Sequence, residues 1–175
     1  MLRLTEDDDI RQVYMLLDQT ELAVADFERA VRCNGDFAIA LVQKLYTDYR
    51  RAYAVRDPAL MQQAMLGFER AIERFPQCSE CYLLYAQVLS DQQEFQKADD
   101  YFGRAVERDP ANATAFVHRG LLQLQWQGDV DKATRLISHA IQLDPKCEFA
   151  FETLGTIEVR VLHLHLLFLW LRLAD

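Results

Sequence analysis

A repeating pattern of small and large apolar positions runs along the chain in four copies. In each copy an alanine is followed at +4 by Phe or Ile, at +7 by a second alanine, and at +12 by Gly or Pro; the copies begin at Ala23, Ala64, Ala98 and Ala133. Steps of four and three place the three apolar residues on one helix face. Proline ends a helix because the residue before it avoids helical geometry. The pattern predicts four helices that close near positions 35, 76, 110 and 145.

The distance between the copies indicates the kind of repeat. Successive copies begin 41, 34 and 35 residues apart. A period near 34 with this helix and a closing proline is typical of the tetratricopeptide repeat, which is a pair of antiparallel helices. We therefore expect an all-α fold, a right-handed solenoid of about four helical hairpins plus a terminal helix. The array is expected over residues 1–159, and residues 160–175 form a divergent hydrophobic tail.

The first helix of each repeat should carry a small residue twelve positions before the first alanine of the second helix, or thirteen where the repeat has one extra residue. These residues are Ala86, Gly120 and Gly155, and we expect them to pack on the partner helix. The 41-residue step predicts a lengthened first helix over residues 37–57. The turn is expected at Arg56-Asp57-Pro58, and Pro58 lies in the first turn of the next helix, where its missing N–H costs nothing.

Stacked helical hairpins line a concave face with their first helices. Side chains near the small residue on the open side should point into this face, where an apolar or amphipathic peptide segment could bind. The alternative is that they only contact a neighbouring helix. The nine candidate groove residues are Leu83, Gln87, Ser90, Val117, Leu121, Leu124, Glu152, Thr156 and Val159.

Composition narrows the classes of function. The chain has 6 Gly and 4 Pro in 175 residues, too few turn-forming residues for a fold of many short strands. The net charge of −8 disfavours nucleic acid as the main ligand.

Residues 161–171 are apolar except for two histidines, but this run is shorter than the ~20 residues that a membrane-spanning helix needs. We expect it to pack on the last repeat or to cause self-association.

No motif indicates catalysis, a cofactor or a metal. The chain contains neither a P-loop nor a G-x-G-x-x-G motif. His118 and His139 have no Ser or Cys nucleophile at a matching spacing, and His163 and His165 have no acidic residue within four positions. Cys78 and Cys81 form a lone C-x-x-C pair, and a zinc site needs two further ligands. We expect these cysteines to be reduced structural thiols and the protein not to be an enzyme.

The amino-acid sequences of several segments are more specific than the spacing of the repeat. The segments LDQTELAVADF (17–27), LYAQVLSDQQ (84–93), HRGLLQLQW (118–126) and FAFETLGTIEV (149–159) closely resemble the C-terminal repeats of the 70-kilodalton import receptor family of the mitochondrial outer membrane. The resemblance covers about residues 16–159. It implies a groove for preproteins with internal targeting signals, such as inner-membrane carriers, and a place on the outer membrane facing the cytosol. Contacts with other import-complex subunits are also possible.

Two departures from that family bear on partners and location. The membrane anchor and the repeats that clamp chaperone tails are missing from this stretch, so the chain could be cytosolic. Clamps for chaperone tails usually carry Asn after the small residue, whereas Gln87, Leu121 and Thr156 stand there. The candidate groove also has no Lys or Arg to pair with a free carboxylate. The alternative reading is a cytosolic scaffold, or a non-functional truncated copy, that binds a folded partner.

Overall fold

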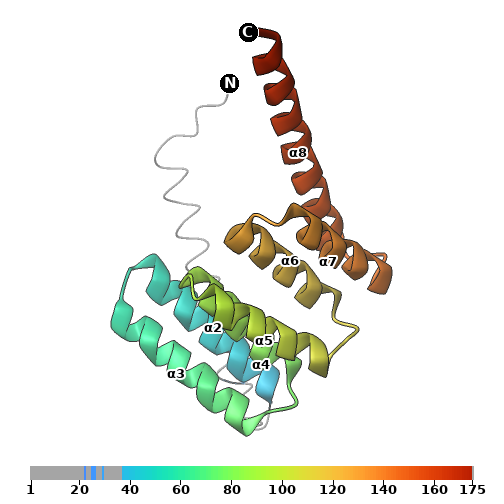
Figure 1. Ribbon diagram of the computed structural model, residues 1–175. Helices are drawn as coiled ribbons and strands as arrows, with labels where there is room; N and C mark the ends of the chain where they lie inside the picture. Colours follow the sequence, from blue (N-terminus) through green and yellow to red (C-terminus); the bar gives the residue numbers. More distant parts are fainter. Residues whose placement is uncertain (1–21, 23–24, 27–28, 30–36, 175) are drawn as a thin grey trace. The chain divides into compact units, whose positions relative to one another are not determined.

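The computed structural model describes residues 37–174 and positions 22, 25, 26 and 29, with side chains placed through residue 160 and at 162 and 163. Residues 37–174 contain seven helices and no strand. Figure 1 draws the helices as coiled ribbons. The all-α tetratricopeptide fold is therefore confirmed. The predicted helix that begins at Ala23 and closes near Gly35 is described only at Ala25, Asp26 and Arg29, which are helical; its repeat positions Ala23, Phe27 and Ala30 lie outside the described residues. The helices are α2 (Ala38–Ala54), α3 (Pro58–Arg74), α4 (Ser79–Asp91), α5 (Phe95–Arg108), α6 (Ala113–Gln127), α7 (Val130–Leu143) and α8 (Glu148–Ala174).

The chain divides into two compact units, residues 1–88 and residues 89–175. The first unit contains α2 and α3. Helix α2 is 17 residues long, whereas the first helices of the next two repeats, α4 and α6, have 13 and 15 residues. The lengthened first helix is therefore confirmed. The carboxylate of Asp57 accepts hydrogen bonds from the backbone N–H groups of Ala59 and Leu60, and Pro58 occupies the first helical position. This cap fixes the predicted turn between α2 and α3.

The repeated apolar positions form the core of the first unit's hairpin. Ala64, Phe68 and Ala71 of α3 are all buried, and the ring of Phe68 stacks on Tyr85 with a centroid distance of 5.5 Å. The Tyr85 hydroxyl donates a hydrogen bond to the Glu69 carboxylate at 3.0 Å. The rings of Phe68 and Tyr85 thus fill the space between α3 and α4, while the Tyr85 hydroxyl keeps a hydrogen-bond partner.

The second unit contains α5, α6, α7 and α8. Its repeated positions are buried as predicted, and the core cluster also includes Val117, Ala150 and Ile157. Pro110 and Pro145 each stand two residues beyond the end of the preceding helix. Gly120 lets α6 approach α7, because a Cβ atom there would lie 3.0 Å from Ile137 Cγ1 and 3.1 Å from the Ala133 carbonyl oxygen.

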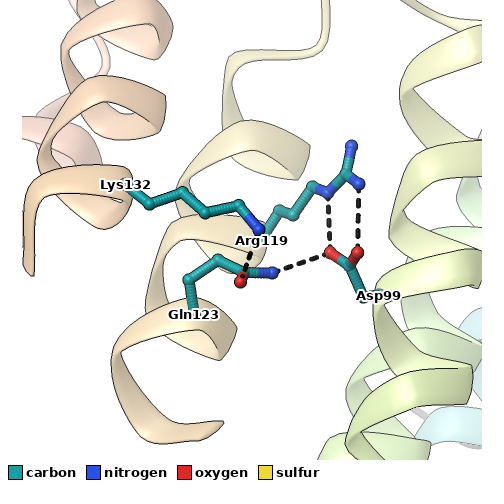
Figure 2. A network of polar contacts seen from close by, with 4 residues as sticks. All are labelled: Asp99, Arg119, Gln123 and Lys132. Atoms are coloured by element: carbon teal, nitrogen blue, oxygen red, sulfur yellow. Dashed lines mark hydrogen bonds and ion pairs between the residues drawn. The ribbon is translucent and has the colours of Figure 1, made fainter. Parts of the chain in front are cut away.

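A polar network joins α5, α6 and α7 (Figure 2). Arg119 forms a two-point ion pair with Asp99, with Nε–Oδ1 at 2.8 Å and Nη2–Oδ2 at 3.2 Å. The side-chain amide of Gln123 is buried; its nitrogen donates to Asp99 Oδ1 at 2.8 Å and its oxygen accepts from Lys132 Nζ at 2.8 Å. Because the buried amide has partners at both ends, the network fixes the spacing of the three helices.

The last helix differs from the prediction at one position. Gly155 was expected to pack on a partner helix, but a Cβ atom there would have no neighbour within 4 Å among the described residues. That expectation is wrong because α8 continues as one helix to Ala174, with no turn after position 159 that would fold a second helix back (Figure 1). Within the described residues, no helix is long and apolar enough to cross a membrane.

Candidate functional site: a groove between α6 and α8

A groove with a volume of about 350 Å³ lies between α6 and α8 in the second unit. It continues along α8 into a more open hollow formed by Glu152, Gly155, Thr156, Val159 and Arg160. We call the two together the α6–α8 groove. The main part is lined by Leu121, Leu124, Phe149, Glu152, Thr153, Thr156, Ile157 and Arg160.

The local packing of each helix aims these residues at the groove. On α6, the close approach at Gly120 turns one side of the helix toward α7, and Leu121 points about 100° away from it. On α8, the buried residues Ala150 and Ile157 fix the inner face against the core. Leu121 and Leu124 are only partly buried, so they offer apolar surface to a ligand without leaving the core.

The two threonines of the groove add little polarity. Thr153 Oγ1 donates a hydrogen bond to the Phe149 carbonyl oxygen at 2.6 Å, and Thr156 Oγ1 donates to the Glu152 carbonyl oxygen at 2.8 Å. Such bonds back to the preceding helical turn occupy the hydroxyl groups. The groove is therefore lined by apolar side chains and two threonines whose hydroxyls already have partners, together with the charged groups of Glu152 and Arg160.

The nine residues predicted from the sequence lie in different environments. Leu121, Leu124, Glu152 and Thr156 line the main groove, and Val159 lines the adjoining hollow. Val117 and Leu83 are buried, so we leave them out of the proposed contact surface. Gln87 and Ser90 are half-buried on α4, and neither lines the α6–α8 groove. The binding role of all nine stays a prediction.

Four lining residues were not among those predicted: Phe149, Thr153, Ile157 and Arg160. Arg160 matters most, because the candidate groove read from the sequence contained no cation. Its position was within reach of the sequence argument. Glu152, Thr156 and Arg160 are spaced four apart, which places them in one stripe along a helix.

An aromatic stack lies behind the groove. The His118 ring is 5.0 Å from the Phe149 ring and 6.3 Å from the Phe102 ring, nearly parallel to the latter. Burial lowers the pKa of His118 to about 4. The imidazole is therefore neutral at physiological pH and packs as an aromatic ring, which links α5 and α8 through α6.

The other candidate chemical groups lie outside the groove. Cys81 is buried on α4, and its burial raises the pKa of the thiol above its usual range, with the nearby Cys78 adding to this effect. A thiol that stays protonated is a poor nucleophile and a poor metal ligand. Within the described residues, no group of three or more His, Cys, Asp and Glu side chains could hold a metal ion.

Comparisons with known proteins agree with this architecture. The family model "Tetratricopeptide repeat" matches residues 79–112, which include α4 and α5. The proteins named mitochondrial import receptor subunit TOM70 from Rattus norvegicus and Homo sapiens are 52% and 51% identical to this chain over 149 residues, or 85% of it.

This chain is TOM70-like and is built of tetratricopeptide repeats. It spans 24% of the length of those two relatives. The crystal structure of yeast Tom70 matches 85% of this TOM70-like chain and 31% of its own length, with a TM-score of 0.64 and 22% sequence identity. At that identity, the structural likeness supports the fold.

Proposed function

We propose that this chain is a non-catalytic receptor module that binds apolar segments of mitochondrial preproteins in the α6–α8 groove. The observation that carries the proposal is the groove itself. It offers partly buried Leu121 and Leu124 on one wall and α8 on the other, and its threonine hydroxyls are already hydrogen-bonded within α8. Grooves of this kind bind the apolar face of a peptide.

The relatives supply the class of ligand. The relatives from Rattus norvegicus and Homo sapiens are both named mitochondrial import receptor subunits. Preproteins with internal targeting signals, such as inner-membrane carriers, are the ligands that the family resemblance implies. On the same basis we propose that the module acts at the mitochondrial outer membrane on the side that faces the cytosol.

A charge placed in the groove tests the proposal. Leu121→Asp puts a carboxylate against the apolar segment, and an unpaired buried charge is costly. We expect the affinity for a labelled carrier-derived apolar peptide, measured by fluorescence anisotropy, to fall roughly tenfold or more. Leu143→Asp is the matched control, because Leu143 is an exposed leucine of α7 that does not line the groove.

A second variant guards against an effect on folding. Thr156 is exposed, so Thr156→Glu should leave the helical circular dichroism signal unchanged and still weaken binding. Unchanged affinity in both groove variants would remove the groove from the binding account. In that case the alternative, a scaffold that binds a folded partner elsewhere on its surface, would be favoured.

A further inference from the structure

The charged side chains of the α6–α8 groove lie at separate points along α8. Glu152 and Arg160 are eight residues apart, which corresponds to about 12 Å along the helix axis at ~1.5 Å per residue. Thr156 stands between them with its hydroxyl turned back to its own helix. The stripe therefore presents a carboxylate, an apolar methyl group and a guanidinium in that order.

Neither charge is neutralised by a described side chain of the groove. At that spacing the two groups are too far apart to form an ion pair with each other. Neither has a hydrogen-bond or ion-pair partner among the side chains that the structure describes, and both residues are exposed. Water solvates them while the groove is open.

A bound peptide changes the solvation of Glu152 and Arg160. A peptide that covers the groove displaces part of that water, and a charge that loses its water without gaining a partner is penalised. An occupant with a cation near Glu152 and an anion near Arg160 replaces the lost solvation, whereas a like charge adds repulsion at one end. A uniformly basic segment would be favoured at Glu152 and disfavoured at Arg160.

We propose that Glu152 and Arg160 select apolar segments that carry one basic and one acidic side chain about 12 Å apart. This inference rests on the proposed function, because it requires a peptide in the α6–α8 groove. A helical peptide matches the spacing with charges eight residues apart, on one face after about two turns. An extended peptide matches it with charges four residues apart, at ~3.3 Å per residue.

The test uses synthetic apolar peptides that differ only in their two charged positions. For each spacing, four and eight, a Lys/Glu peptide is compared with Lys/Lys and Glu/Glu versions by fluorescence anisotropy. At one of the two spacings, we expect the Lys/Glu peptide to bind roughly two- to fivefold more tightly than either like-charged version. The preference should shrink at high salt, because exposed charges are screened.

A double-mutant cycle assigns each charge to its partner. Glu152→Gln should lose the preference for the peptide's Lys, and Arg160→Gln should lose the preference for its Glu. Replacing the peptide's Lys by Gln should then cost nothing further in Glu152→Gln. The crossed pair, Glu152→Gln with the peptide's Glu replaced by Gln, should be additive and serves as the internal control.

The outcomes separate this inference from the function on which it rests. Equal affinity for all charge patterns, together with loss of binding in Leu121→Asp, would overturn the charge selection and leave the groove as the binding site. Binding that is unaffected by Leu121→Asp and Thr156→Glu would overturn both. Matched coupling at either spacing supports the proposal and also reports whether the bound peptide is helical or extended.

Discussion

The helices α6 and α8 occupy equivalent places in successive repeats, yet their surroundings differ. Both follow a proline-containing turn, and both carry a glycine at the matching position, Gly120 and Gly155. A Cβ atom on Gly120 would contact α7 at 3.0–3.1 Å, whereas a Cβ atom on Gly155 would have no described neighbour within 4 Å. The same sequence signal thus marks a closed contact in one repeat and an open surface in the next.

The residues around these glycines show the same contrast. Phe116 of α6 is half-buried and packs edge-on against the His139 ring at 4.6 Å. Its counterpart on α8, Phe151, is 50% exposed, and Val159 is 68% exposed. The repeat pattern therefore specifies which helix face is apolar and small, and the presence of a partner helix decides whether that face contributes to stability.

The largest difference in stability is expected from shortening a side chain at the closed contact of α6 and one on the open face of α8. Ile137 is fully buried against α6, so Ile137→Ala should lower the free energy of unfolding by about 3–4 kcal/mol through lost burial and a cavity. Val159→Ala on the open face of α8 should change it by less than about 0.5 kcal/mol. Urea unfolding followed by circular dichroism measures both. Equal losses would show that α8 is as tightly packed as α6.

A somewhat smaller effect on the free energy of unfolding is expected from pH, because His118 of α6 packs against Phe149 of α8. The native His118 stays neutral down to about pH 4, whereas in the unfolded chain it takes up a proton below about pH 6.5. Its stabilising contribution is therefore complete above pH 6.5 and is lost as the pH falls toward 4. The loss by pH 4.5 should be about 2–3 kcal/mol.

The variant His118→Phe keeps an aromatic ring between Phe102 and Phe149 but cannot be protonated. Its stability should depend less on pH than that of the unmodified chain, by the amount just given. The comparison is the difference in urea midpoint between pH 7.5 and 4.5 for each protein. Identical pH dependence would mean that His118 takes up its proton over the same pH range in the folded and unfolded chains, which would contradict a lowered pKa in the stack.

The smallest effect on stability is expected from replacing Gly155 and Gly120 by alanine. Gly155→Ala should stabilise the chain by about 0.5–1 kcal/mol, because alanine has the higher helix propensity and its Cβ would meet no atom of the described residues within 4 Å. Gly120→Ala should lower stability by about 1 kcal/mol, since the new Cβ presses on a backbone carbonyl and on Ile137. Paired thermal unfolding curves give the difference. A stabilising Gly120→Ala would show that α6 and α7 can separate at little cost.

Most of the fold could be predicted because repetition makes local signals agree. The spacing of Ala64, Phe68 and Ala71 identified a buried helix face, and Pro76 marked its end; the structure confirms both. The polar network around Gln123 was not predicted, because its partners come from three helices and no local spacing connects them. The environment of Gly155 was missed for a related reason, since a repeat pattern assumes a partner helix.

The candidate site was predicted less completely than the fold. Leu121 and Thr156 follow directly from the position of the small residue, and both line the groove. Val117 fits the same rule but is buried, because the rule gives a direction on the helix and not the depth at which the neighbouring helix lies. Arg160 continues the four-residue spacing of Glu152 and Thr156, but it lies one turn beyond the residues that the position of the small residue selects. The packing of α8 beside α6 places it at the border of the groove.

The most direct test of the account is photo-crosslinking from inside the groove. A photoreactive amino acid at position 156 faces the α6–α8 groove, and one at position 142 lies on an exposed part of α7 outside it. With a labelled carrier-derived apolar peptide, the account predicts a saturable crosslink at position 156 that unlabelled peptide competes away, and none at position 142. Equal labelling at both positions, or labelling at position 142 alone, would contradict binding in the groove.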